Sequence, residues 1–240
     1  MKWVYNKARI IQRQLLPAQC LLCGDAGKNE RDLCQGCHDD LPWNRPTCPR
    51  CAAPLAADQV ATWACGTCIK APPPFDLAVS AFRYTLPVDR LIRDLKFRGK
   101  LTHARLLGHL ILEAVRDQRH IPWPSAIVPV PLHPSRYRQR GFNQALEIAR
   151  PVASALDLPL LTNAVIRARA TDEQSRLDLP SRRRNLTDAF QVIGKIPAHV
   201  VMVDDVHTSG STLTAMAKAL RSAGAKQVEA WTAARALPPQ

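Results

Sequence analysis

All eight cysteines of this chain lie between positions 20 and 68, and none follows Cys68. They form four C-x-x-C pairs: Cys20/Cys23, Cys34/Cys37, Cys48/Cys51 and Cys65/Cys68. A C-x-x-C turn directs two thiolates at one ion, and two such turns complete the tetrahedron that zinc prefers. Because the four pairs supply only thiols, the pattern predicts two closed, structural zinc sites.

Other uses of paired cysteines fit this sequence less well. Disulfides need an oxidising compartment, a thioredoxin-type redox pair needs a βαβ context, and iron–sulfur clusters use different cysteine spacings. Neighbouring pairs are separated by ten, ten and thirteen residues. Sequential pairing, first with second and third with fourth, is the simplest arrangement, and a crossed arrangement stays open.

The composition changes shortly after the last cysteine. The segment from Lys70 to Phe75 contains three consecutive prolines, which interrupt any regular element, and aliphatic residues dominate beyond it. With 240 residues and 46% hydrophobic content, the chain is long enough for one domain and a small module. We therefore expect an N-terminal helix and zinc-binding module in residues 1–72 and an α/β domain in residues 73–240.

Charge and hydropathy restrict location and partners. Lys7, Arg9 and Arg13 interrupt the N-terminal segment, and the apolar run 106–115 contains Gly, His and Glu, so we expect no signal peptide, no membrane span and a cytoplasmic protein. The net charge of +13 favours phosphate-bearing partners. Charge alone does not distinguish a polynucleotide from a small phosphorylated ligand, or either from a merely basic surface.

Strand and helix patterns alternate after residue 76. Apolar segments at 77–84, 126–130, 160–167, 199–203 and 228–234, and one through Phe190, indicate strands. Helical periodicity follows at 87–97, at 102–115 with Thr102 as its cap, from about Asn143, and after residue 212. Pro151 is expected to kink or shorten the third helix. The alternation predicts a parallel sheet flanked by helices.

The strand at 199–203 ends in a polar segment suited to a sugar phosphate. Asp204 and Asp205 follow the strand directly and can accept hydrogen bonds from hydroxyls. The loop after them contains small and hydroxyl residues, Thr208, Ser209, Gly210, Ser211 and Thr212. Successive backbone N–H groups at the start of a helix favour a phosphate, and Gly210 permits a tight turn around it.

Two segments resemble a known family. Residues 200–212, Val-Val-Met-Val-Asp-Asp-Val-His-Thr-Ser-Gly-Ser-Thr, resemble the signature of type I phosphoribosyltransferases for phosphoribosyl pyrophosphate (PRPP). Residues 128–144, together with the leading cysteine pairs, resemble the ComF/GntX family, which is linked to competence and DNA utilisation. The resemblance implies a type I phosphoribosyltransferase fold that binds PRPP with Mg²⁺, behind a cysteine-rich zinc module.

The resemblance also assigns roles to individual residues. The loop that receives pyrophosphate maps onto Ser135, Arg136, Arg140, Gly141, Asn143 and Gln144. The mobile loop that closes over the ligand maps onto the segment 167–185 with Arg167, Gln174 and Arg182. Asp204 and Asp205 would stabilise positive charge developing on the ribose. A solvated basic loop and a disordered linker are the alternatives for the two loops.

Three functions remain open at this stage. The chain could be a phosphoribosyltransferase with an unidentified acceptor, a factor that handles single-stranded DNA with the DNA-uptake machinery, or a regulator that senses PRPP without turnover. The aromatic content of 5% offers few stacking platforms for DNA bases. No residue stands out as a base toward a particular nucleophile.

Overall fold

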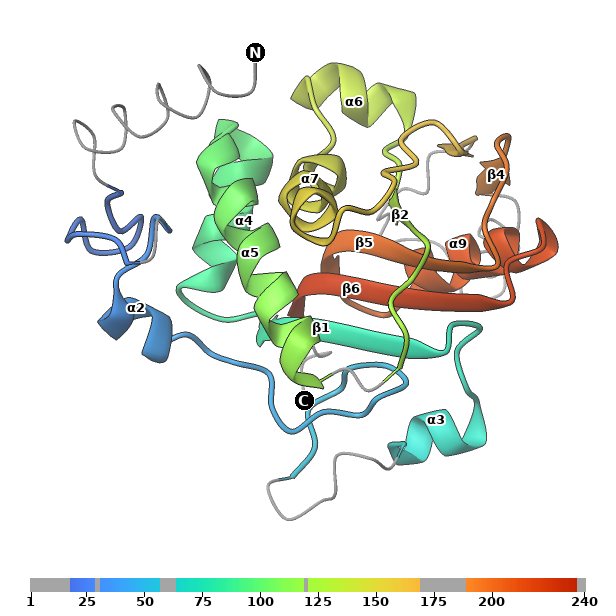
Figure 1. Cartoon of the computed structure of the whole chain (residues 1–240), viewed down its shortest axis with the longest axis horizontal. Helices are drawn as coiled ribbons and strands as arrows, with labels where there is room; N and C mark the ends of the chain where they lie inside the picture. The colour runs from blue at the N-terminus through green and yellow to red at the C-terminus, as the bar shows by residue number, and fades with distance from the viewer. Residues whose placement is uncertain (1–17, 29–30, 57–63, 119–120, 169–188, 237–240) are drawn as a thin grey trace, which may run out of the picture. The chain divides into compact units, whose positions relative to one another are not determined.

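The computed structural model describes residues 18–28, 31–56, 64–118, 121–168 and 189–236 (Figure 1). Contacts divide the chain into two compact units, Met1–Pro42 and Trp43–Gln240. The expected N-terminal helix lies outside the described residues, as do Gln174 and Arg182 of the expected mobile loop. The domain boundary that the change of composition indicates after residue 72 stays a prediction.

The first unit is built from two tight turns and a short helix. An antiparallel bridge joins Gln19 to Ala26, and helix α2 (Gln35–Asp39) follows Cys34. Among its described residues, only Cys20, Leu33 and Leu41 are buried hydrophobic side chains. So few apolar contacts cannot offset the conformational entropy of ordering the segment, which agrees with a fold held by metal.

The second unit centres on a four-stranded parallel sheet with the strand order β1-β6-β5-β2. Its strands are β1 (Leu77–Arg83), β2 (Ala126–Pro129), β5 (His199–His207) and β6 (Gln227–Arg235). Nearly every residue of these strands is buried, as expected for a sheet covered on both faces. The parallel sheet predicted from the alternating pattern is thus confirmed.

Helices cover both faces of this sheet (Figure 1). The helices are α3 (Gly66–Lys70), α4 (Val88–Arg98), α5 (Leu101–Gln118), α6 (Pro134–Arg140), α7 (Gln144–Leu156) and α9 (Ser211–Ser222). Helices α5 and α7 pack together on one face, and α9 covers the other. On the α9 side, Val200 and Met202 of β5 contact the apolar cluster that includes Leu213, Met216 and Leu220.

A small second sheet lies apart from the parallel one. Strands β3 (Val165–Arg167) and β4 (Phe190–Val192) pair antiparallel, with Val165 opposite Val192. The strand expected at 160–167 is therefore shorter, although Leu160 still forms a parallel bridge with Ile127 of β2. This two-stranded sheet carries Arg167, the first residue of the expected mobile loop.

Two local expectations need correction. Thr102 does not cap its helix, because Gly99 in the left-handed conformation ends α4 and α5 already begins at Leu101. The basic segment after β2 is also not entirely a loop, since α6 occupies Pro134–Arg140. The side chain of His133 accepts a hydrogen bond from the N–H of Ser135, and Pro134 stands at the first helical position, where proline is favoured.

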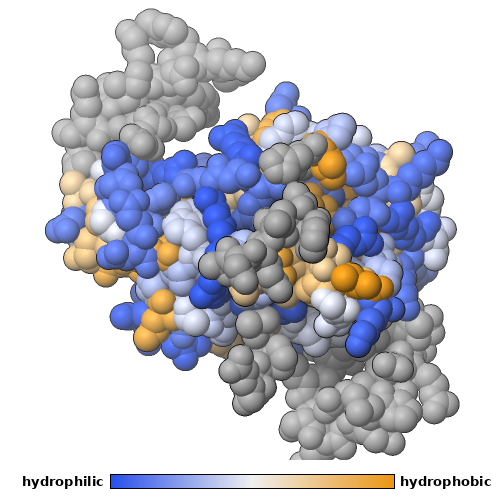
Figure 2. All heavy atoms as spheres, turned by 90° about the horizontal axis from the view of Figure 1, so that it is seen from below, coloured by the Kyte–Doolittle hydropathy of each residue, from blue (hydrophilic) through white to orange (hydrophobic). Residues whose placement is uncertain are grey.

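The surface is mainly hydrophilic. One face shows blue, hydrophilic side chains with hydrophobic ones in small separate groups (Figure 2). Within the described ranges no helix is both long and apolar enough to cross a bilayer. The exposed large hydrophobic side chains include Ile69, Leu86 and Phe97, which come from different elements.

Helix α7 continues through Pro151 rather than ending there, contrary to the expected shortening. Gly108 of α5 lies directly against this part of α7. A Cβ added to Gly108 would come within 2.5 Å of both the Ile148 carbonyl oxygen and the Pro151 ring. The absence of a side chain at Gly108 therefore allows the two helices that cover this face to approach closely.

We expect the substitution Gly108→Ala to destabilise the second unit. Alanine favours a helix over glycine by about 1 kcal/mol, but the clash with α7 forces a shift of the packed helix. Such overpacking typically costs about 1–3 kcal/mol, so we expect a net loss of up to about 2 kcal/mol in the free energy of unfolding, measured by urea denaturation. Gly66→Ala in α3 is the matched control, because a Cβ there meets nothing within 4 Å. Equal or higher stability of Gly108→Ala would contradict the inferred contact.

Candidate functional site

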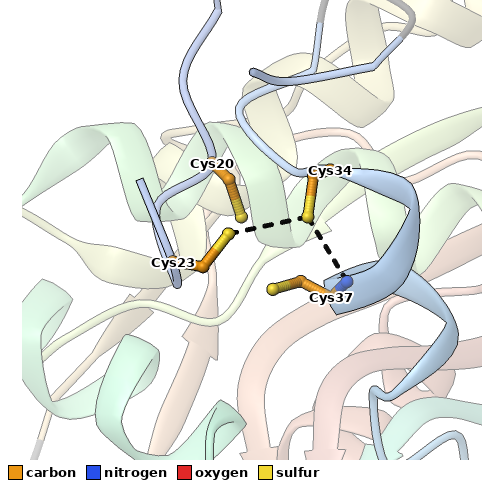
Figure 3. A group of neighbouring side chains, drawn as sticks. All are labelled: Cys20, Cys23, Cys34 and Cys37. Atoms are coloured by element: carbon orange, nitrogen blue, oxygen red, sulfur yellow. Dashed lines mark hydrogen bonds between the residues drawn. The ribbon is translucent and has the colours of Figure 1, made fainter. Parts of the chain in front are cut away.

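The first four cysteines converge on one point (Figure 3). The sulfur atoms of Cys20, Cys23, Cys34 and Cys37 all lie within 4.8 Å of one another, and the Cys23 and Cys34 sulfurs are 3.6 Å apart. Four sulfurs about 2.3 Å from one zinc ion would be about 3.8 Å apart, so the cluster fits a tetrahedral site. Burial opposes ionisation of Cys20, but backbone N–H groups outweigh it and lower the pKa of this thiol to about 6.

The other four cysteines form a second cluster. Cys48, Cys51, Cys65 and Cys68 also place their sulfurs within 4.8 Å of one another, with 3.7 Å between those of Cys51 and Cys65. A hydrogen bond from Cys51 outweighs burial and lowers the pKa of Cys48 to about 4, which favours a thiolate. Sequential pairing is thus confirmed, and the crossed arrangement is excluded. Each four-thiol set suits a structural zinc ion.

The second cysteine cluster is part of the α/β unit. Ala52, next to Cys51, is fully buried in the same apolar cluster as the residues of α9. The N–H of Ala78 in β1 donates to the Pro49 carbonyl at 2.9 Å, and the guanidinium of Arg235 in β6 donates to the Cys51 carbonyl at 3.2 Å. The turn between Cys48 and Cys51 therefore packs directly on the sheet.

The expected acidic pair lies at the carboxyl end of the central strand β5. Ligands of open α/β folds bind outside this end of the strands. Asp204 and Asp205 continue β5 beyond the last residue of its neighbour β2, and only 8% of Asp204 and 4% of Asp205 is exposed. The N–H of Asp205 donates to a carboxylate oxygen of Asp204 at 2.9 Å. Two carboxylates are thus held together in a nearly dry environment.

Their surroundings drive the two pKa values apart. Burial, reinforced by the charge of Asp205, raises the pKa of Asp204 well above its ordinary value. Burial also opposes the charge on Asp205, but an ion pair with Lys96 of α4 lowers the pKa of Asp205. Burial disfavours the charge on Lys96 as well, yet the two carboxylates outweigh it and raise the pKa of Lys96. Asp205 is therefore the ionised member of the pair.

Further cations approach the same carboxylates. Arg140, at the end of α6, lies in the field of Asp205 and Asp204, and Arg167 in β3 lies in the field of Asp204. Burial lowers the pKa of both guanidinium groups, although both stay charged at neutral pH. Arg140 donates to the side chain of Gln144, which is buried and helps to lower the pKa of Asp205. Positive charge thus comes from three separate elements.

Arg140, Gln144 and Arg167 were predicted from the sequence as site residues, but Lys96 was not. Lys96 belongs to a helix that was predicted from its apolar residues alone. Its partner Asp205 is distant in the sequence. The basic residues between Lys96 and Lys100 were the available signal. They did not single out Lys96, because basic residues are also common at the solvated end of an ordinary helix. Only the fold brings α4 to the end of β5.

The loop after β5 has the shape expected of an anion site. Gly210 adopts the left-handed conformation with φ of 78°, and α9 begins at Ser211. The hydroxyl of Ser209 donates to that of Ser211 at 3.1 Å, and Thr208 and Ser209 are exposed. The N-terminal N–H groups of a twelve-residue helix consequently face a loop of small polar residues.

The buried ring of His207 and the partly buried Arg235 support this loop. The ring of His207 lies so close to Gly210 that a Cβ on the glycine would be 2.9 Å from its Nε2 atom. Burial, with a contribution from Arg235, lowers the pKa of His207 to about 3, so the ring is neutral. Arg235 donates to the carbonyls of His207 and Thr208. The loop conformation is therefore fixed by its supports as well as by its sequence.

The remaining residues of the expected pyrophosphate loop have varied positions. Asn143 caps α7, because its side chain accepts from the N–H of Ala145 and donates to the Val130 carbonyl, each at 3.0 Å. Ser135 hydrogen-bonds His133, and Arg136 and Gly141 are exposed. The structure brings Arg140 and Gln144 to the acidic pair, whereas Asn143 holds the backbone that carries them.

A parallel sheet whose central strand ends in buried carboxylates and a helix-opening loop is the arrangement of the phosphoribosyltransferase class. Residues 143–237 match the model of the phosphoribosyl transferase domain, and residues 11–69 match that of the double zinc ribbon domain. Both matches agree with the fold and with the two thiol clusters.

Curated relatives cover nearly the whole chain. Competence protein F of Haemophilus influenzae is 35% identical over 226 residues, which are 91% of this chain and 97% of the relative. DNA utilization protein YhgH of Salmonella typhi is 34% identical over 92% of this chain and 99% of the relative. Competence protein ComFC of Streptococcus pneumoniae is 27% identical over 64% of this chain and 66% of the relative. The chain belongs to the ComF/GntX family of competence and DNA utilization proteins.

Proposed function

We propose that this protein binds PRPP at the carboxyl end of β5 and uses this site in the utilisation of DNA. The observation that carries the proposal is the pair Asp204 and Asp205, nearly buried beside Lys96 and followed by the helix-opening loop. A cluster of opposite charges with such perturbed pKa values is typical of a ligand site.

Each part of PRPP has a chemically suitable partner. The carboxylates of Asp204 and Asp205 would accept hydrogen bonds from the ribose hydroxyls. The loop of residues 208–212 would hold the 5′-phosphate through backbone N–H groups and the hydroxyls of Thr208, Ser209, Ser211 and Thr212. The pyrophosphate would lie near Lys96 and Arg140, and Mg²⁺ bound with PRPP would neutralise part of its negative charge. Arginine is suited to hold two phosphate oxygens at once.

The role in DNA utilisation rests on the names of the relatives. Proteins called competence protein F and DNA utilization protein resemble this chain along nearly their entire length. A cytoplasmic location is part of the proposal, because eight free thiols in zinc-binding geometry require a reducing compartment.

The proposal is tested by titrating Mg²⁺·PRPP into the zinc-loaded protein in a calorimeter. We expect Asp204→Asn, which keeps the shape of the side chain, to weaken binding by about two- to tenfold, because it replaces one hydrogen-bonding oxygen of a neutral carboxyl group and such a hydrogen bond contributes about 0.5–1.5 kcal/mol. Asp117→Asn is the control, since this exposed carboxylate of α5 pairs with Arg45. Absence of PRPP binding by the unmodified protein would refute the proposal.

A second measurement, of pyrophosphate released from PRPP, distinguishes a catalyst from a sensor. Released pyrophosphate, measured with candidate acceptors added one at a time, would assign a phosphoribosyltransferase. Tight binding of PRPP with no release would assign a regulator that keeps the site without turnover.

A further inference from the structure

We propose that Phe97 and Arg140 form a stacking platform for one unpaired nucleobase at the rim of the proposed PRPP site. The platform would select a substrate that carries a nucleobase, and its location beside the ligand rests on the proposed function. The shared chemistry is a planar, electron-rich ring linked to phosphate. Such a ring belongs either to a small nucleotide acceptor or to a single strand of DNA.

Phe97 is exposed to solvent, unlike the other large hydrophobic residues of α4. It stands in the last turn of α4, whose buried residues include Leu91, Ile92 and Leu95. Its side chain is 74% exposed, more than that of any other large hydrophobic residue within the described ranges. The ring therefore contributes little to the packing of α4.

The position of Phe97 connects it to the acidic pair. The preceding residue, Lys96, forms the ion pair with Asp205. The guanidinium carbon of Arg140 lies 5.9 Å from the centre of the Phe97 ring, and Arg140 itself lies in the field of Asp205 and Asp204. Helices α4 and α6 thus place an aromatic ring and a guanidinium side by side at the edge of the proposed ligand site.

A second exposed ring lies on the same face of α6. Tyr137 precedes Arg140 by three residues, which places the two side chains on neighbouring positions of the helix surface. Tyr137 is 51% exposed, and α6 has no buried residue. The helix therefore presents arginines and an aromatic ring to solvent rather than a face that packs on the sheet.

This combination matches what single-stranded nucleic acids require. A nucleobase stacks on an aromatic ring or on a guanidinium plane, and its phosphate is attracted to nearby positive charge. The low aromatic content of the chain does not count against one local platform.

The test measures how much the bases contribute to binding. A labelled oligothymidine and an abasic strand of the same length would be titrated by fluorescence anisotropy into the unmodified protein, Phe97→Ala and Phe97→Tyr. Because stacking is worth a roughly five- to hundredfold change per base, we expect Phe97→Ala to reduce the preference for the base-containing strand by about tenfold. Phe97→Tyr, which keeps the ring, should restore the preference.

Leu86→Ala is the matched control. Leu86 is 71% exposed and precedes α4, so it lies beyond the opposite end of the same helix, whose axis extends about 14 Å from Val88 to Phe97. A loss of general surface hydrophobicity would affect both variants equally, whereas stacking at the rim would affect only Phe97→Ala. Circular dichroism verifies that the variants are folded.

The outcomes distinguish the stacking platform from the proposed PRPP site, and a small nucleotide from single-stranded DNA as the ligand. Weaker binding of thymidine 5′-monophosphate by Phe97→Ala would assign a small nucleotide, and weaker binding of the strand alone would assign DNA. An unchanged preference for bases in Phe97→Ala, or no binding of either probe by the unmodified protein, would overturn the stacking platform. PRPP carries no base, so its titration tests the proposed function independently of this result.

Discussion

Replacing Cys48 and Cys51 by serine is expected to unfold the α/β unit, whereas the same change at Cys20 and Cys23 is expected to leave the sheet folded. A structural zinc site contributes about 10–16 kcal/mol at neutral pH, which equals or exceeds the 5–15 kcal/mol that stabilises a typical domain. The difference arises because the Cys51 turn packs on the sheet through Ala52 and Arg235. The first cluster lies in the other compact unit.

Three measurements check this prediction. Zinc content gives the number of bound ions in each double variant, and circular dichroism gives the remaining secondary structure. Thermal denaturation then shows whether the main transition survives. We expect one zinc ion and a native-like transition for Cys20→Ser/Cys23→Ser, and loss of the transition for Cys48→Ser/Cys51→Ser. A native-like transition in the latter variant would show that the second cluster does not support the sheet.

Replacing Lys96 by methionine is expected to destabilise the unit strongly. Methionine has a similar volume but leaves the buried carboxylate of Asp205 without its counter-ion. Removing one partner of a buried ion pair typically costs about 3–5 kcal/mol. Arg98→Met is the control, because Arg98 is exposed and its partner Asp94 keeps a second ion pair with Lys100, so the loss of this pair should cost about 1 kcal/mol or less.

The loss of unfolding free energy in Lys96→Met should depend on pH. In the unmodified protein Lys96 lowers the pKa of Asp205, so this carboxylate stabilises the fold above its unfolded pKa of about 3.9 and loses that effect as the pH falls through its folded pKa. Without Lys96, burial raises the pKa of Asp205 instead. The gap in unfolding free energy between protein and variant should therefore widen from about pH 4 upward. A pH-independent gap in urea denaturation would contradict the ion pair.

Features encoded by neighbouring residues were predictable from the sequence. Cys pairs at fixed spacing indicated the metal clusters, and the segment from Asp204 to Thr212 combined a buried strand, two carboxylates and a helix start in one run. Helical periodicity over residues 87–97 predicted the extent of α4, which ends where Gly99 adopts the left-handed conformation that glycine prefers. Local sequence determined each of these features.

Features that depend on distant residues were not predictable in this way. Lys96 joins Asp205, and Arg235 joins Cys51, only because the fold brings separate segments together. Pro151 did not shorten α7, and this part of the helix packs closely against Gly108 of α5, which is distant in the sequence. Tertiary contacts, which no short window of sequence contains, decided these cases.

The strand order also restricts when the protein can fold during its synthesis. Strand β6, the last element described, lies between β1 and β5, and its Arg235 reaches the Cys51 turn. Strand β1 therefore lacks its parallel neighbour until residues 227–235 have left the ribosome. Such non-local pairing slows folding and leaves apolar strands exposed in the meantime. The sheet consequently completes itself only after translation of almost the entire chain.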